Sequence, residues 1–170
     1  MNMVIEATGR LIVAIDTIAR INEVLGTLAA EQRGAISKMR SPDVGAIVAR
    51  QREIGRQLAT AEEDRRRETQ HLCRALALPE GTSIADLVRA VGTHDRAVGQ
   101  ALGEAAGRAK QAILGCQKEQ RVVHAAATGV MAHLDGLARQ VLAHMNQAGV
   151  YAASGALAGG QTPRGVDCVS

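Results

Sequence analysis

A single Glu-x-x-His motif, Glu68 to His71, is the pattern in this chain that comes closest to a metal site. In helical di-iron proteins such a motif supplies one half of the site, and the other half needs a second motif and two further glutamates. The chain contains no second Glu-x-x-His. We therefore predict no iron site and no other cofactor.

The other histidines and the cysteines also lack the spacing that known chemistry requires. His124, His133 and His144 do not lie four residues apart, which is the spacing of a zinc-binding pair on a helix. His94 could accept a phosphoryl group near the start of a helix, but no lysine accompanies it. The cysteines form no Cys-x-x-Cys pair, and Cys116 is expected to be a small buried apolar residue. We predict that the protein is not an enzyme.

The composition favours helices. Hydrophobic residues make up 46% of the 170 residues, yet the chain has no Trp, no Phe and a single Tyr, Tyr151. Aromatic residues favour sheets, whereas Ala and Leu favour helices. We therefore predict an all-α protein whose helices pack closely together.

The charge pattern argues against nucleic-acid binding and membrane insertion. The 20 Lys and Arg exceed the 17 Asp and Glu by a net charge of +3, but the two signs alternate, most clearly in Glu62–Glu68. Nucleic-acid binding needs basic residues gathered on one face. No stretch approaches the roughly 20 apolar residues of a membrane span, and Glu6 and Arg10 interrupt the first apolar stretch, unlike a signal peptide. We expect a cytoplasmic protein.

The first predicted helix covers residues 3 to about 40 and carries a heptad pattern. Its seam advances by alternating steps of four and three residues over about five heptads. Asn22 lies on this seam, where it could be buried and fix the register or could be exposed. The seam consists of Val4, Thr8, Leu11, Ile15, Ile18, Asn22, Leu25, Ala29, Gln32, Ile36 and Met39.

A second long helix is predicted from Ser41 to about Leu78. Ser41 would cap it, and Pro42 suits the first helical position. Because the joint is short, the two helices should form an antiparallel hairpin. Residues 62–70 are almost wholly polar and could lie in solvent, where the second helix extends past the first.

A short helix should follow the second long one. Pro79 ends the second helix because proline cannot continue it. Ser83 or Thr82 would cap a helix over Ile84–Val91, and Gly92–Thr93 would end that helix.

The last predicted helix runs from about His94 to about Gln147. Gly99, Gly103 and Gly107 lie four residues apart near its start, a spacing that lets another helix approach closely. The sequence beyond is small, polar and glycine-rich without periodicity. We therefore predict one helical domain over residues 1–149, an elongated antiparallel bundle or coiled coil of three long helices and one short helix, and a disordered tail over residues 150–170.

Two segments and the order of the helices point to a known family. Leu72–Val91 reads LCRALALPEGTSIADLVRAV, and Tyr151–Gly155 has the form Tyr-x-x-x-Gly. This layout resembles the FlgN-type flagellar export chaperones, in which a segment similar to LGLP…SLAELI joins the second helix to a short helix. The chain departs from that pattern at Ala77, where the family has Gly, and at residues 152–154, where Pro or Asp is common.

The resemblance implies a cytosolic chaperone for hook-associated proteins, which form the hook–filament junction. Such a chaperone binds the helix-forming C-terminal segment of its client and delivers the client to the flagellar type III export machinery. An apolar stripe on the last helix could bind this segment or could pack on the first two helices. The stripe consists of Val130, Leu134, Leu137, Val141 and Met145.

Two further hypotheses concern partners. Tyr151 could dock on the export gate or its ATPase, because it is the only aromatic residue. The principal alternative function is a generic coiled-coil structural or oligomerisation protein without a secreted client. Such a protein would self-associate through the Val4–Met39 seam, and a homodimer is compatible with this pattern.

Overall fold

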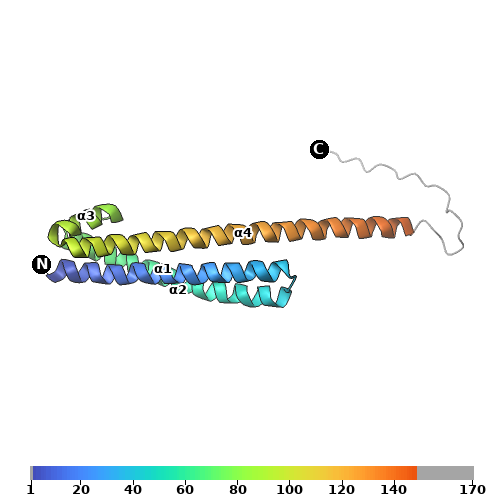
Figure 1. Cartoon of the computed structure of the whole chain (residues 1–170), viewed down its shortest axis with the longest axis horizontal. Helices are drawn as coiled ribbons and strands as arrows, with labels where there is room; N and C mark the ends of the chain where they lie inside the picture. The colour runs from blue at the N-terminus through green and yellow to red at the C-terminus, as the bar shows by residue number, and fades with distance from the viewer. Residues whose placement is uncertain (1, 149–170) are drawn as a thin grey trace, which may run out of the picture. The chain divides into compact units, whose positions relative to one another are not determined.

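The computed structural model describes the backbone of residues 2–148 and the side chains of residues 3–144. In this range the chain forms α1 (Asn2–Ser37), α2 (Ser41–Ala75), α3 (Ile84–His94) and α4 (Arg96–Ala148), without a strand (Figure 1). The prediction of an all-α fold with three long helices and one short helix is confirmed. The predicted tail, residues 150–170, lies outside the described residues, so the proposed domain boundary stays a prediction.

The chain divides into two units, the first over residues 1–127 and the second from residue 128 onward. The first contains α1, α2, α3 and the first part of α4, and the second contains the remainder of α4. The bundle and its core belong to the first unit.

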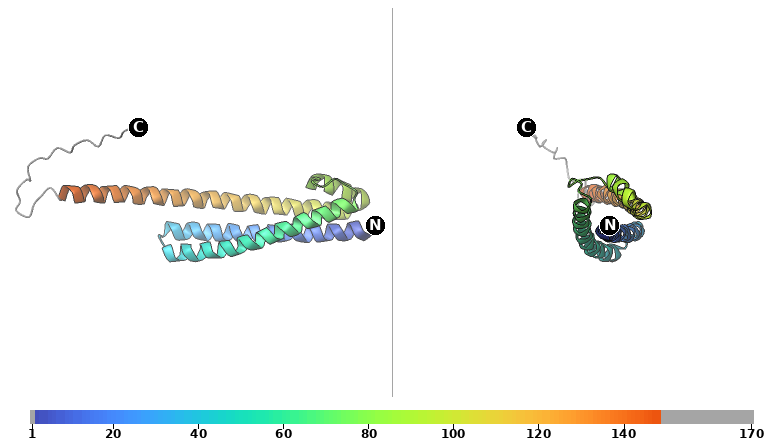
Figure 2. Two further views of the ribbon diagram at one scale, coloured as in Figure 1. Left: turned by 180° about the vertical axis from the view of Figure 1, so that it is seen from behind. Right: turned by 90° about the vertical axis from the view of Figure 1, so that its left-hand side faces the viewer.

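In the first unit α1 and α2 form the predicted antiparallel hairpin (Figures 1 and 2). Near the start of α1, Arg10 pairs with Glu68 near the end of α2, with 3.0 Å between Nε and Oε2. Near the end of α1, Gln32 accepts a hydrogen bond of 3.0 Å from Gln51, which lies earlier in α2. The partner number falls as the α1 number rises, which is the mark of antiparallel helices.

The first part of α4 runs parallel to α1. Arg108 pairs with Asp16 at 2.8 Å, and Glu119 pairs with Arg33 at 3.4 Å. Both residue numbers rise together along the two helices. The connection through α3 therefore returns the chain to the end of the bundle at which it began.

The heptad seam of α1 forms one side of the core. Its side chains from Val4 to Ala29 are all buried, and Leu11 is completely so, with 0% exposure. Asn22 is buried as well, and its Nδ2 donates to the carbonyl of Ile18 at 2.9 Å. The other helices contribute buried side chains opposite this seam: Ala61, Leu72, Cys73, Leu87, Val91, Leu102, Ala105, Ala109 and Cys116.

The prediction that the polar middle of α2 extends past α1 is wrong, although Glu63, Arg66, Arg67 and Gln70 are exposed. Residues 62–70 run alongside α1, and Glu68 is only 19% exposed at its side chain because it pairs with Arg10. Glu62, Asp64 and Arg65 are also partly buried. Charged side chains beside a helix can cover apolar surface with their carbon chains while their charged ends stay in water.

The turn between α1 and α2 is set by Met39 rather than by the predicted cap at Ser41. Met39 is left-handed, with a φ of 53°. The amides of Arg40 and Met39 bond to the carbonyls of Ala35 and Ile36, both at 3.0 Å, which is the Schellman pattern at a helix end. The residue before α2 is Arg40, which makes no side-chain cap, and Ser41 is already helical.

A second Schellman turn ends α2 at Ala75, three residues before the predicted end. Ala77 has a φ of 53°. The amide of Leu78 donates to the carbonyl oxygen of Cys73 at 2.8 Å, and the amide of Ala77 donates to the carbonyl oxygen of Arg74 at 3.2 Å. Ala77 is the position at which the FlgN-type pattern has Gly, so an alanine here occupies a conformation that suits glycine.

The junction of α3 and α4 also differs from the prediction. Ser83 caps α3 as expected, accepting from the amide of Asp86 at 3.2 Å. Gly92 does not end α3, which continues to His94. The break falls at Asp95, whose carboxylate accepts hydrogen bonds of 2.9 and 3.1 Å from the amides of the next helix. His94 therefore ends α3 instead of beginning α4.

Two of the three spaced glycines of α4 lie against another helix. A Cβ atom on Gly99 would lie 2.7 Å from the Cα of Gly92 and 3.1 Å from the carbonyl oxygen of Val88. A Cβ on Gly103 would make an ordinary contact of 3.5 Å with the Val88 side chain, and one on Gly107 would meet nothing within 4 Å. The predicted close approach is confirmed at Gly99, where α3 and α4 meet backbone to backbone.

We predict that Ala77→Gly stabilises the protein. The left-handed conformation costs alanine about 1 kcal/mol more than glycine, so the free energy of unfolding should rise by about that amount. Urea unfolding followed by circular dichroism measures this change. Ala59→Gly is the matched control, because Ala59 is an exposed helical residue of α2. This change should lower the free energy of unfolding by about 1 kcal/mol. If Ala77→Gly lowers the free energy of unfolding as Ala59→Gly does, the left-handed turn at Ala77 is contradicted.

The glycine contact yields a second prediction. Gly99→Ala should lower the free energy of unfolding by about 2 kcal/mol, because the added methyl group forces two backbones apart. Gly107→Ala, eight residues further along α4, should raise it by up to about 1 kcal/mol, because alanine is the better helix former. Thermal unfolding of the two variants beside the unchanged protein tests this opposition, and equal shifts would reject it.

Candidate functional site

The predicted apolar stripe is exposed where its side chains are described. In the second unit, Leu134, Leu137 and Val141 are 49%, 44% and 57% exposed, while Val130 is half-buried. Their spacing of four, three and four residues places them on one face of α4. The side chain of Met145 and the whole of Tyr151 lie outside the described residues. The structure therefore presents part of the predicted set as a continuous apolar face.

Two more apolar side chains, which the sequence reasoning missed, widen this face. Met131 and Leu142 are more exposed than the stripe itself. Met131 follows Val130 and Leu142 follows Val141, so each lies about 100° around the helix from a residue of the stripe. Met131 and Leu142 were missed because they do not occupy heptad positions of the seam. Their exposure makes them available to the same partner.

Few charges accompany the stripe. Between Val130 and His144 the only Asp, Glu, Lys or Arg residues are Asp135 and Arg139. His144 contacts the carbonyl of Gln140 in its own helix through Nδ1, at 2.9 Å. A surface of this kind binds by covering apolar area and not by attracting an ion.

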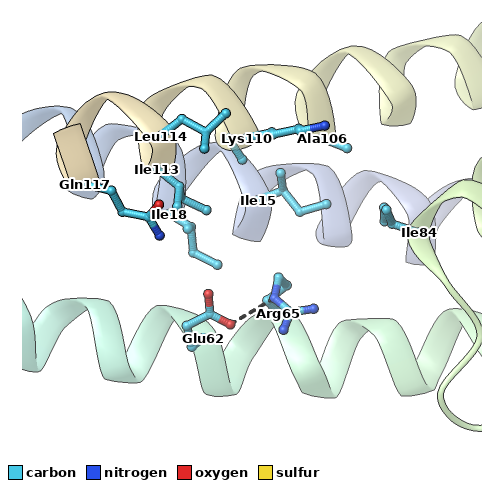
Figure 3. Close-up of a pocket in the computed structure, with 11 residues that line it drawn as sticks. Ile15, Ile18, Glu62, Arg65, Ile84, Ala106, Lys110, Ile113, Leu114 and Gln117 are labelled. Carbon is cyan, nitrogen blue, oxygen red and sulfur yellow. Dashed lines mark hydrogen bonds and ion pairs between the residues drawn. The ribbon is translucent and has the colours of Figure 1, made fainter.

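A second apolar surface lies in the first unit, and the sequence reasoning did not identify it. It is a groove of about 400 Å³ between α1, α2 and α4, close to the start of α3 (Figure 3). Ile15 and Ile18 of α1 form one side, Ile113 and Leu114 of α4 another, and Ile84 stands at one end. Leu114 is 49% exposed, so the groove is open to solvent.

The groove has polar edges on α2 and α4. On α2, Arg65 donates from Nε to Glu62 at 3.0 Å, which balances the two charges. On α4, Lys110 and Gln117 line the opposite edge (Figure 3). Gln117 also lines an adjoining hollow with Gln120, Arg121 and His124, so the concave surface continues along α4.

The heptad patterns explain why this groove was missed. Ile15 and Ile18 lie on the predicted α1 seam and are buried at the base of the groove, whereas the exposed residues Leu114 and Ile84 fall outside that seam. The groove exists because three helices leave a space between these side chains, and the register of three helices cannot be read from the pattern of one. The available signal in the sequence was the adjacent apolar pair Ile113–Leu114, of which Leu114 is exposed.

The residues considered for catalysis lie in ion pairs, are buried, or are separated from one another. Glu68 pairs with Arg10, and the hydrogen bond from Arg10 to Glu68 raises the pKa of the guanidinium above its ordinary value. Burial raises the pKa of the Cys116 thiol, which makes the thiolate less available. Among the described residues, no three His, Cys, Asp or Glu side chains gather as metal ligands would.

Comparison with known proteins places these surfaces in context. No curated protein and no solved structure matches the chain. Within the described range, no helix combines the length and the apolar character needed to cross a membrane. A family model with the description FlgN protein matches residues 1–159, nearly the whole chain. The chain thus belongs to the FlgN family of flagellar export chaperones.

Proposed function

We propose that the clients of this chaperone are the hook-associated proteins of the hook–filament junction. The chain binds their helix-forming C-terminal segments in the cytoplasm, keeps them from assembling early and delivers them for type III export. Membership of the family supports an export chaperone in general. The exposed stripe on α4 is the observation that supports a helical client segment.

The stripe has the form that a helical ligand requires. A partner helix that lies along α4 would cover Val130, Leu134, Leu137 and Val141 with its own apolar side chains, as in helix-in-groove recognition. Fully covering a Leu or Val side chain contributes about 1.5–3 kcal/mol, and these side chains are roughly half exposed at the start. A few such contacts are enough for measurable binding.

The alternative of a client-free coiled-coil protein finds less support. It requires the seam of α1 to face a second copy. From Val4 to Ala29 that seam is already covered inside the chain, since Leu11, Ile18 and Ala29 are at most 2% exposed. Self-association through α1 would therefore require the bundle to open first.

We assign to Tyr151 a role in docking on the export gate or its ATPase. Tyr151 is the only aromatic residue of the chain, and it follows the last helix in sequence. An aromatic side chain with a polar end is a common anchor in protein interfaces. This assignment rests on the sequence alone, because the residue lies outside the described range.

The stripe yields a direct prediction. Replacing Leu134 and Leu137 with Asp should weaken binding of a hook-associated C-terminal segment at least about a hundredfold, because two charges would have to be buried at the interface. Isothermal titration calorimetry with the full chain measures the affinity.

The matched control replaces Ala132 and Ala143 with Asp. Both residues are exposed on the opposite side of the same helix. Asp at these positions disfavours the helix about as much as Asp at Leu134 and Leu137, but it does not alter the stripe. This variant should bind the segment as the unchanged protein does. Undiminished binding by a folded Leu134→Asp, Leu137→Asp variant would reject the stripe as the client site.

The tail yields a separate prediction. Removing the residues after Gly149 should leave the affinity for the client segment unchanged and should weaken capture by the cytoplasmic part of the export gate. Tyr151→Ala in the full chain should reproduce the loss, because the aromatic ring is the proposed anchor. Tyr151→Phe, which retains the ring, is the control. If the truncated chain binds the gate normally, the tail has no docking role.

A further inference from the structure

The α4 edge of the groove carries an excess of positive charge. Lys110 lines the groove, and Arg121 lines its continuation beyond Gln117. Glu62 is the only carboxylate among the residues that line these two hollows, and its partner Arg65 balances it. The concave surface therefore has an apolar interior and an uncompensated basic edge.

The positions of the two cations follow from the helix period. Lys110 and Arg121 are three turns apart, about 16 Å along the axis, and lie on nearly the same line as Leu114 and Gln117. Both are exposed, and neither belongs to any of the ion pairs found in the described residues. Arg108 and Glu119, their charged neighbours in sequence, are instead paired with Asp16 and Arg33 of α1.

Such an arrangement selects among possible occupants. A nucleic-acid strand would find two cations beside isoleucine and leucine side chains, without the aromatic platforms that stack bases. An amphipathic helix would place its apolar side against Ile84, Ile113 and Leu114. Carboxylates on its flank could then reach the α4 edge. The apolar interior and the basic edge together favour the helix.

We propose that this groove is a second client-binding surface, which takes an amphipathic helix of the hook-associated C-terminal segment with carboxylates spaced about three turns apart on one flank. The carboxylates pair with Lys110 and Arg121 while the apolar stripe of the helix covers Leu114. This inference rests on the proposed function and adds to it the location of a separate surface and the charge of the segment that binds there.

The test measures the affinity of the full chain for the C-terminal segments of the hook-associated proteins of the same bacterium. Lys110→Glu and Arg121→Glu should each weaken binding about fivefold at low salt, as expected for one partly exposed ion pair. The effect should shrink at 0.5 M salt because exposed pairs are screened. Leu114→Glu should weaken binding at both salt concentrations.

Lys118 supplies a matched control. It is an exposed lysine of the same helix with no ion pair in the described residues, and it lines neither hollow. Lys118→Glu makes the same charge change and should alter the affinity less than twofold. As a second readout, a photoreactive phenylalanine at Leu114 should cross-link to the client segment, and the same group at Lys118 should not.

The outcomes separate this inference from the function on which it rests. If the unchanged protein binds the segments and Lys110→Glu behaves like Lys118→Glu, the groove inference is overturned and the proposed function stands. If the unchanged protein binds none of the segments, both fall. A protein that sediments as a dimer without client, and becomes a monomer when Lys110 is changed to Glu, would make a second copy the occupant and overturn the inference.

Discussion

Close approach of helix backbones is the constraint on which the bundle depends. With no Trp or Phe to fill space, the helices pack through Leu, Ile and Ala side chains and approach each other closely at glycines. Gly26 faces the backbone of Cys116, where an added Cβ would lie 3.6 Å from its Cα, and Gly99 meets Gly92 more closely still. The second contact joins α3 to α4 and so determines where α4 begins to lie beside α1.

Periodicity predicted the core well because a helix repeats its geometry without regard to what surrounds it. The seam of α1 is buried at each position from Val4 to Ala29, and the antiparallel hairpin follows from the short joint. Helix ends were predicted less well. They depend on Met39 and Ala77, which adopt left-handed conformations that neither residue type favours, and on Gly92, whose missing side chain serves packing and does not end the helix.

The surfaces were harder to predict than the core because they depend on what each side chain meets. The sequence showed that Leu134 and Leu137 share a face but left open whether other helices cover them. The groove depends on how Ile15, Ile113 and Ile84 come together from separate helices. Likewise, Lys110 and Lys118 look equivalent in sequence, and only the packing shows that one of them borders an apolar groove.

Many of the large apolar side chains of α4 remain exposed after folding. Close backbone contacts inside the bundle fall at Gly26 and Gly99, whereas α4 carries most of the exposed large apolar residues in the described range, including Leu114, Leu134 and Leu137. Leucine at an exposed position adds little to the stability of an isolated chain, because its area stays in water. These leucines would contribute more to stability inside the bundle. Their position on α4 is explained if they are covered when a client helix binds.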